Sequence, residues 1–203
     1  MLHPRRLALI FATAALGALA AAPAANAATG CDAPTSKPFA QWLDYGNYQA
    51  VPGGSFENGP AGWTVTGSTA IVAGNEPWKV GGAGDAKALS IPNGATATSP
   101  ATCAGLGFPT FRYFLRKTSG LLTSVRADVL YLDEGHIVGS LPLGLLGLAG
   151  SSWSPGLLPS LTLAGLPLVT GNPTDSSIAL RFTAVGGNVQ IDDVYIDPYS
   201  RTR

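Results

Sequence analysis

Three carboxylates lie within six residues near the C-terminus of this 203-residue chain, at Asp192, Asp193 and Asp197. Acidic groups this close together repel one another unless water or a bound cation offsets their charge. The surrounding residues alternate as in a half-buried strand, but the phase of the alternation changes between Ile191 and Val194. This change predicts a β-bulge, or the end of the strand's contact with one sheet, with acidic side chains at the irregularity.

A further acidic residue, Glu57, lies far earlier in the chain, next to the turn-forming pair Asn58-Gly59. Two aromatic residues that flank it, Phe56 and Trp63, are expected to anchor this stretch in a core. We infer that the stretch around Glu57 meets the final strand, which is predicted over Gly187–Tyr199. From the residues alone, a cation site and a set of solvated turn carboxylates both stay open.

Residues 1–27 have the three parts of a cleaved signal peptide. A basic start with Arg5 and Arg6 precedes the apolar run Leu7–Ala22, and Ala25–Ala27 fits a small-residue cleavage site. A membrane anchor is the alternative, but this run is short for a membrane span of about 20 residues. We therefore expect export of the chain into the extracellular space or the cell envelope.

Residues 28–203 are then long enough for a single domain with its own core. Loss of two signal-peptide arginines would leave ten of the twelve basic residues against twelve acidic ones, a balance that does not favour a nucleic-acid partner. Cys31 and Cys103 are the only cysteines, and in an exported chain we expect them to pair. Two free thiols or a mixed metal site are the alternatives.

Short alternating segments separated by turns predict an all-β fold, and 26 glycines and 16 prolines suit such turns. Thr110–Lys117 is typical of a strand, because Phe111, Tyr113 and Leu115 share one face and two arginines share the other. We expect an antiparallel two-sheet β-sandwich of the jelly-roll type with about nine to eleven strands and no transmembrane segment after signal cleavage. Further expected elements are strands at Ser55–Glu57, Leu122–Leu132, His136–Ser140 and Ser177–Val185, and a loop leading to one or two strands within Leu141–Leu168.

The segment Phe39–Tyr48 contains four aromatic residues among ten. It could form a surface that stacks on a ligand, or it could wrap over one sheet. We favour the wrapping segment, because aromatic side chains mostly serve burial.

Two stretches carry a resemblance to a known family. The sequence GSFENGPAGW over Gly54–Trp63 and the sequence VQIDDVYIDP over Val189–Pro198 together resemble the galactose-binding-like β-jelly-roll superfamily. The likeness is greatest to carbohydrate-binding modules that carry calcium, and to exported actinobacterial proteins, and it covers roughly Cys31–Tyr199. In that superfamily a structural Ca²⁺ often lies between these two stretches. Carried over, the resemblance implies Glu57 and Asp192 as metal ligands, with Asp193 as their neighbour.

The resemblance also implies glycan binding, because such modules stack exposed aromatic rings on the C–H face of a sugar. Three tryptophans have a loop-like context and are candidates for this role: Trp42, Trp78 and Trp153. Trp63 follows the family's Gly-Trp pattern and is expected in the core. We therefore expect a secreted, non-catalytic module that binds a polysaccharide or a cell-surface glycan, with a structural calcium site.

An enzyme would need residues that the sequence does not arrange well. His136, the only histidine outside the signal peptide, lies in a strand-like run, where histidine is most often structural. Asp133 and Glu134 are adjacent in a tight turn and point apart, unlike the two carboxylates of a glycosidase. We expect no catalysis. The alternatives are a cell-envelope structural or protein-interaction module of the same fold, and a hydrolase that uses His136.

Overall fold

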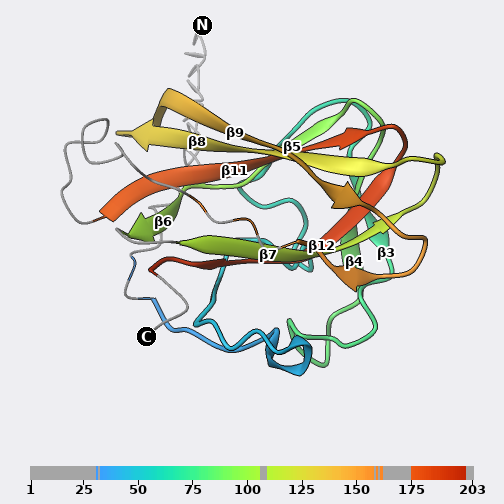
Figure 1. The fold of residues 1–203 in the computed structure, drawn as a ribbon, viewed down its shortest axis with the longest axis horizontal. Coiled ribbons are helices and arrows are strands. Elements are labelled where there is room, and N and C mark those ends of the chain that lie inside the picture. Colours follow the sequence, from blue (N-terminus) through green and yellow to red (C-terminus); the bar gives the residue numbers. More distant parts are fainter. Residues whose placement is uncertain are drawn as a thin grey trace, which may run out of the picture.

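The computed structural model describes residues 31, 33–105, 109–157, 159, 161 and 175–199. In this part of the chain, twelve antiparallel strands form two sheets of six strands each, which pack face to face (Figure 1). The expected antiparallel β-sandwich is confirmed. The strand count exceeds the expected nine to eleven because two-residue strands such as Gln49–Ala50 are too short to produce a visible alternation.

The first sheet has the order β10-β7-β12-β4-β3, and β1 pairs with β12 beyond that path. Its strands are β10 (Ser154–Pro155), β7 (Thr110–Lys117), β12 (Val189–Asp197), β4 (Lys87–Ile91), β3 (Ala70–Ala73) and β1 (Gln49–Ala50). The second sheet has the order β2-β5-β11-β8-β9, and β6 pairs with β11. Its strands are β2 (Thr64–Val65), β5 (Thr96–Thr98), β11 (Asp175–Val185), β8 (Ser124–Asp133), β9 (His136–Leu148) and β6 (Thr102–Gly105).

The core fills the space between the two sheets. On β7, Phe111, Tyr113 and Leu115 face inward as the alternation predicts, and they belong to the same buried cluster as Leu180 and Phe182 of β11. Burial of each such side chain stabilises the fold by about 1.5–3 kcal/mol. The other face of β7 is thereby turned away from the core, and this outer face carries Arg112, Phe114 and Arg116.

The predicted irregularity in the final strand is a β-bulge. β12 pairs with β7 in register from Val189 to Asp192, and the register then shifts before Tyr195. Asp193 lies in the bulge with a φ of 46°, in the left-handed region that most side chains avoid. The shift keeps Ile191 before the bulge and Val194 after it in the core. The bulge therefore allows two adjacent aspartates in a strand that is buried on one face.

Two expected elements are wrong. Ser55–Glu57 is a turn, not a strand: Phe56 has a φ of 59°, and the Gly59 N–H donates to the Phe56 carbonyl. Within Leu141–Leu168, where a loop leading to one or two strands was expected, the short strand β10 is present, but Leu141–Leu148 is not a loop: it belongs to β9, which pairs with β8 through three register shifts. The shifts and the glycines hide the alternation that would identify a strand. Of the remaining Leu-rich stretch, residues 158, 160 and 162–168 lie outside the described residues.

The segment Phe39–Tyr48 wraps across the outer face of the first sheet, and it is the blue stretch below β7 and β12 in Figure 1. Phe39 and Tyr48 are buried there against Phe114 and Tyr195, which confirms the wrapping segment. The only helical element in the described chain is the 3₁₀ turn η1 (Ala40–Trp42) in this segment.

The expected disulfide is present. It joins Cys31 to Cys103 of β6 with a Cα–Cα distance of 5.1 Å, and so ties the start of the described chain to the second sheet. No helix among the described residues has the length and apolar character needed to cross a membrane.

Candidate functional site

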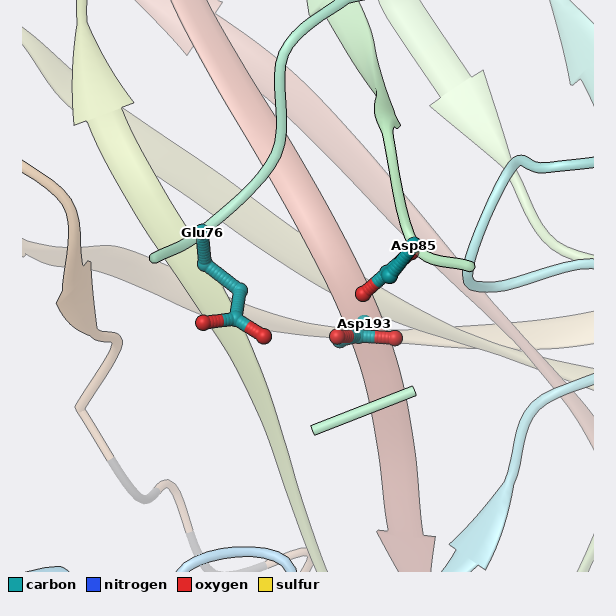
Figure 2. A group of neighbouring side chains, drawn as sticks. All are labelled: Glu76, Asp85 and Asp193. Atoms are coloured by element: carbon teal, nitrogen blue, oxygen red, sulfur yellow. The ribbon is translucent and has the colours of Figure 1, made fainter. Parts of the chain in front are cut away.

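Three buried carboxylates meet where the β3–β4 loop, residues 74–86, crosses the bulge of β12. Glu76 and Asp85 come from this loop and Asp193 comes from the bulge, and each offers an oxygen within 4.8 Å of the others. Figure 2 shows the three side chains turned toward one another. Their exposed fractions are 0%, 2% and 1%. We call Glu76, Asp85 and Asp193 the acidic cluster.

Backbone N–H groups of the β3–β4 loop orient this cluster. The two Glu76 carboxylate oxygens accept hydrogen bonds from the N–H groups of Trp78 and Val80, the latter at 2.6 Å. The Gly81 N–H donates to Asp193 Oδ2 at 3.2 Å. The loop is thus folded around its own carboxylate, and the Gly81 N–H attaches it to the bulge together with the Glu76 N–H, which donates to Asp192.

Asp85 carries the clearest sign of a missing partner. Both of its carboxylate oxygens are buried, and no described residue donates a hydrogen bond to either. Its polar neighbours are the carboxylates of Glu57 and Asp193. The ion pairs among the described residues involve Asp44 and Asp128, and none includes a member of the acidic cluster. No arginine or lysine of the described chain therefore forms an ion pair with the cluster. A buried, uncompensated carboxylate is strongly destabilising, and a cation would satisfy it.

Gly81 lies directly against two of the carboxylates. A Cβ on this residue would lie 2.6 Å from Asp193 Oδ1 and 3.1 Å from Asp85 Oδ2, so only a residue without a side chain fits here. The loop backbone therefore approaches both carboxylates closely, and the Gly81 N–H donates to Asp193.

The electrostatics of the site agree with this geometry. Burial, followed by repulsion from Asp85, raises the pKa of Asp192 to about 8. Burial, followed by repulsion from Asp192 and Asp85, raises the pKa of Asp193 to about 9. Burial also raises the pKa of Asp85. The protein alone does not stabilise the ionised forms of these three groups.

The structure brings all three metal ligands predicted from sequence to this region. The Val51 N–H donates to the Val194 carbonyl and the Val194 N–H donates to Gly54, so the stretch before Glu57 does meet the final strand. Asp193 belongs to the acidic cluster, and Asp192 is fully buried beside it, where it accepts the Glu76 N–H at 3.3 Å.

Glu57 lies at the edge of this region rather than inside the acidic cluster. One of its oxygens, Oε1, accepts the N–H groups of Ala86 and Lys87 at 2.8 and 2.6 Å, directly after Asp85. Partial burial opposes ionisation, but these two N–H groups outweigh it and lower the pKa of Glu57.

Sequence reasoning missed Glu76 and Asp85. Both lie in a loop without periodicity, so nothing in their spacing indicates burial. The available signal was their position at the two ends of a glycine-rich loop, residues 76–85, in a chain with few acidic residues.

The three candidate ligand-binding tryptophans also lie together. Trp42 and Trp78 make an edge-to-face contact at 4.8 Å between ring centroids, and both lie against Phe114 of β7. Trp153 packs against the same cluster, with the Arg116 guanidinium 4.9 Å from its ring centroid. Trp78 is 40% exposed. We call Trp42, Trp78 and Trp153 the aromatic patch, which lies on the outer face of the first sheet.

Other candidates have different surroundings. Trp63 is buried between Phe56 and Phe182, as expected for a core residue. His136 is exposed at the start of β9 and pairs in register with Asp133 across the hairpin. A cavity of about 370 Å³ lies beside the acidic cluster, and its lining includes Asp193 and Gly81.

No family model matches the chain, and no curated protein matches it. Among solved structures, 116 chains are similar. One contains the CBM22-1 and GH10 modules of xylanase Xyn10B from Clostridium thermocellum with xylohexaose, at 16% identity and a TM-score of 0.48, covering 76% of this chain and 28% of that one. Another is TmCBM61 with β-1,4-galactotriose, at 15% identity and a TM-score of 0.41, covering 72% and 96%.

A third similar structure is the enzymatically active domain of tailspike protein 4 from bacteriophage CBA120. It has 18% identity and a TM-score of 0.44, and the match covers 72% of this chain and 21% of that chain. The similar structures thus include carbohydrate-binding modules, the class that the sequence resembles. Because these TM-scores are below 0.5, the functional proposal below depends on the residues of this chain.

Proposed function

We propose that this protein is an exported, non-catalytic glycan-binding module whose ligand surface is held in place by a structural Ca²⁺. The supporting observation is that one loop, β3–β4, contributes to both sites. It supplies Glu76 and Asp85 to the acidic cluster, and between them it presents the half-exposed ring of Trp78 to solvent.

Ca²⁺ fits the acidic cluster by its chemistry. The available donors are oxygens, with no histidine or cysteine among them, and Ca²⁺ takes about six to eight oxygen ligands in an irregular arrangement. Glu76, Asp85 and Asp193 would hold the ion, with Asp192 and Glu57 close enough to add charge. The ion would supply the positive charge that the buried carboxylates of the chain lack.

A glycan fits the aromatic patch. A sugar presents an apolar C–H face that stacks on an aromatic ring, and hydroxyl groups that need polar neighbours. Trp78 and Trp153 provide the rings. Arg116, whose guanidinium lies 4.9 Å from the Trp153 ring centroid, and Gln190, to which Arg116 donates a hydrogen bond at 2.8 Å, provide polar groups on the same sheet.

A polysaccharide pull-down together with a glycan array tests the proposal. Wild-type protein should bind at least one polysaccharide, and Trp78→Ala or Trp153→Ala should weaken that binding. Tyr45→Ala is the matched control, because Tyr45 is 58% exposed and makes no ring contact with the described tryptophans. A wild-type protein that binds no polysaccharide refutes glycan binding, and equal loss in the control variant refutes the assignment of the patch.

Export is part of the same proposal. Residues 1–27 lie outside the described residues, and the disulfide between Cys31 and Cys103 suits an oxidising compartment. The intact mass of the protein recovered outside the cytoplasm should correspond to residues 28–203. Recovery of the uncleaved chain in the membrane fraction would refute cleavage.

A second candidate function is protein interaction in the cell envelope. Among the described strands, β9 lies at the edge of the second sheet, and Ile137, Val138, Leu145 and Leu148 are exposed on it, with Leu122 exposed near its end. Edge strands that present apolar side chains are templates for association. Sizing and crosslinking on intact cells would detect such contacts, and a monomer with polysaccharide affinity and no crosslinked partner would exclude them.

A further inference from the structure

Glu76 makes contacts in two directions at once. One of its carboxylate oxygens lies within 4.8 Å of ligand oxygens from Asp85 and Asp193. The same carboxylate also accepts the backbone N–H groups of Trp78 and Val80. The group that would contact a cation therefore also fixes the backbone from which the Trp78 ring projects.

The Trp78 ring in turn depends on that backbone for its place in the aromatic patch. It contacts Trp42 edge-to-face at 4.8 Å and lies 5.5 Å from Phe114. Trp42 comes from the wrapping segment and Phe114 from β7, so Trp78 is the member of the patch that the β3–β4 loop supplies. A change in the loop would move this ring and leave the sheet beneath it unchanged.

We propose that Glu76 is a positioning residue that couples cation binding in the acidic cluster to the orientation of Trp78, so that the cation and the glycan raise each other's affinity. This inference rests on the proposed function, which it deepens. The acidic cluster is supported as a cation site by the two buried oxygens of Asp85, to which no described residue donates a hydrogen bond.

The physical basis is repulsion among buried carboxylates. Without a cation, Glu76, Asp85 and Asp193 face one another in a space from which water is largely excluded. Like charges in such surroundings separate or take up protons. The Glu76 side chain belongs to a loop that one backbone N–H, donated to Asp192, joins to β12 at this residue, whereas Asp193 belongs to a strand that is paired with β7 on both sides of the bulge. Movement of the Glu76 carboxylate away from the cluster would remove the acceptor for the Trp78 and Val80 N–H groups.

Coupling of this kind is reciprocal, because the two affinities belong to one thermodynamic cycle. Typical couplings change affinity about 5- to 150-fold. Calcium should therefore strengthen glycan binding by a factor in this range, and a saturating glycan should strengthen calcium binding by the same factor.

The ligand-independent test is ¹⁹F NMR of protein labelled with 5-fluorotryptophan, recorded with calcium and with a chelator. The Trp78→Phe variant assigns the Trp78 resonance. Calcium should shift the resonances of Trp78 and Trp42, and it should leave that of Trp63, in the core, unchanged. The Trp63 resonance also reports that each variant is folded. Calcium binding measured by calorimetry with no change at Trp78 would overturn the coupling, as would the absence of calcium binding.

Two variants separate the roles within the site. Asp85→Asn removes a cation ligand that does not touch the Trp78 backbone, and its Trp78 resonance should no longer respond to calcium. Glu76→Asp keeps the charge but shortens the side chain, so calorimetry should detect weakened calcium binding, and the Trp78 resonance should not respond even when calcium is saturating. A full Trp78 response in Glu76→Asp would refute Glu76 as the coupling residue.

Glycan binding then distinguishes this inference from the proposed function. A Trp78 resonance that responds to calcium in a protein that binds no glycan supports the positioning role of Glu76 and refutes the proposed function. Glycan affinity that is the same with calcium and with chelator refutes the coupling and leaves glycan binding intact.

Discussion

Chelation of calcium should lower the thermal stability of the protein. An ion that binds the folded state alone stabilises it by RT ln(1 + [L]/Kd), which is about 2.7 kcal/mol when the free ion is at a hundred times its dissociation constant. In a domain of 150–250 residues, 1 kcal/mol shifts the melting temperature by about 2–4 °C. Addition of a chelator should therefore lower it by roughly 5 to 11 °C.

The assay is a melting curve of the wild type in millimolar calcium and in excess chelator, followed by the same pair of curves for each variant. Asp85→Asn should abolish the difference between the two conditions. Gly81→Ala should do so without any change of charge, because its methyl group would lie 2.6 Å from Asp193 Oδ1. Asp133→Asn, at an exposed position at the end of β8, should keep the full difference.

The same experiment decides between two sets of cation ligands. The structure supports Glu76, Asp85 and Asp193, whereas the sequence resemblance implies Glu57, Asp192 and Asp193. Glu57→Gln should keep most of the calcium dependence, since Glu57 Oε1 already accepts the N–H groups of Ala86 and Lys87. Loss of the dependence in Glu57→Gln, together with its survival in Asp85→Asn, would favour the ligands that the sequence resemblance implies. Identical wild-type curves with calcium and with chelator would refute the cation site.

Three further predictions follow from the same contacts. In chelator, the free energy of unfolding should fall as pH rises from about 4 to about 8–9. Unfolded aspartates release their protons near pH 4, whereas folded Asp192 and Asp193 hold theirs to about pH 8 and 9. Urea titrations should show this fall, and saturating calcium should reduce it. Replacement of both Cys31 and Cys103 by serine should cost about 4 kcal/mol, from the loop entropy of a 72-residue separation, and should leave the calcium-dependent melting shift intact. Phe114→Ala should lower the free energy of unfolding in urea by about 3–5 kcal/mol, because Phe114 is fully buried beneath the aromatic patch. The same variant should bind glycan more weakly, while its calcium affinity in calorimetry should not change.

The sequence predicted the elements whose signals are local. Alternation identified β7 and β11 with their inward faces, and the change of phase located the bulge at Asp192 and Asp193. These features are visible because each depends on which neighbours in the chain share a face. The disulfide followed from the cysteine count and the expected compartment.

The features that the sequence did not predict depend on contacts between distant segments. Glu76 and Asp85 resemble solvated loop residues until β12 lies beneath the loop. The long strand β9 was missed because its bulges and glycines remove the period of two. The same holds for the aromatic patch, because Trp42, Trp78 and Trp153 come from three segments that are distant in the sequence and meet only on the outer face of the first sheet.

Two of the chain's other buried acids, Asp44 and Asp128, show how the fold compensates a structural carboxylate. Asp44, 4% exposed, is paired with Arg112 at 2.7 Å and accepts the Tyr48 hydroxyl at 2.8 Å. Asp128, 5% exposed, is paired with Arg181 at 3.0 Å. In both cases the fold supplies the compensating cation from a neighbouring strand or segment.

At the acidic cluster the described residues supply backbone N–H groups and further carboxylates, but no cationic side chain. The nearest lysines in the described chain turn elsewhere: Lys79 Nζ donates to the Ala83 carbonyl, and Lys87 Nζ donates to the Glu57 carbonyl. A protein that pairs two buried aspartates with arginines, yet leaves both oxygens of the buried Asp85 without a donor among the described residues, is arranged for a cation from solution. Because that cation would neutralise the loop that carries Trp78, calcium should govern the ligand surface as well as the stability of the fold.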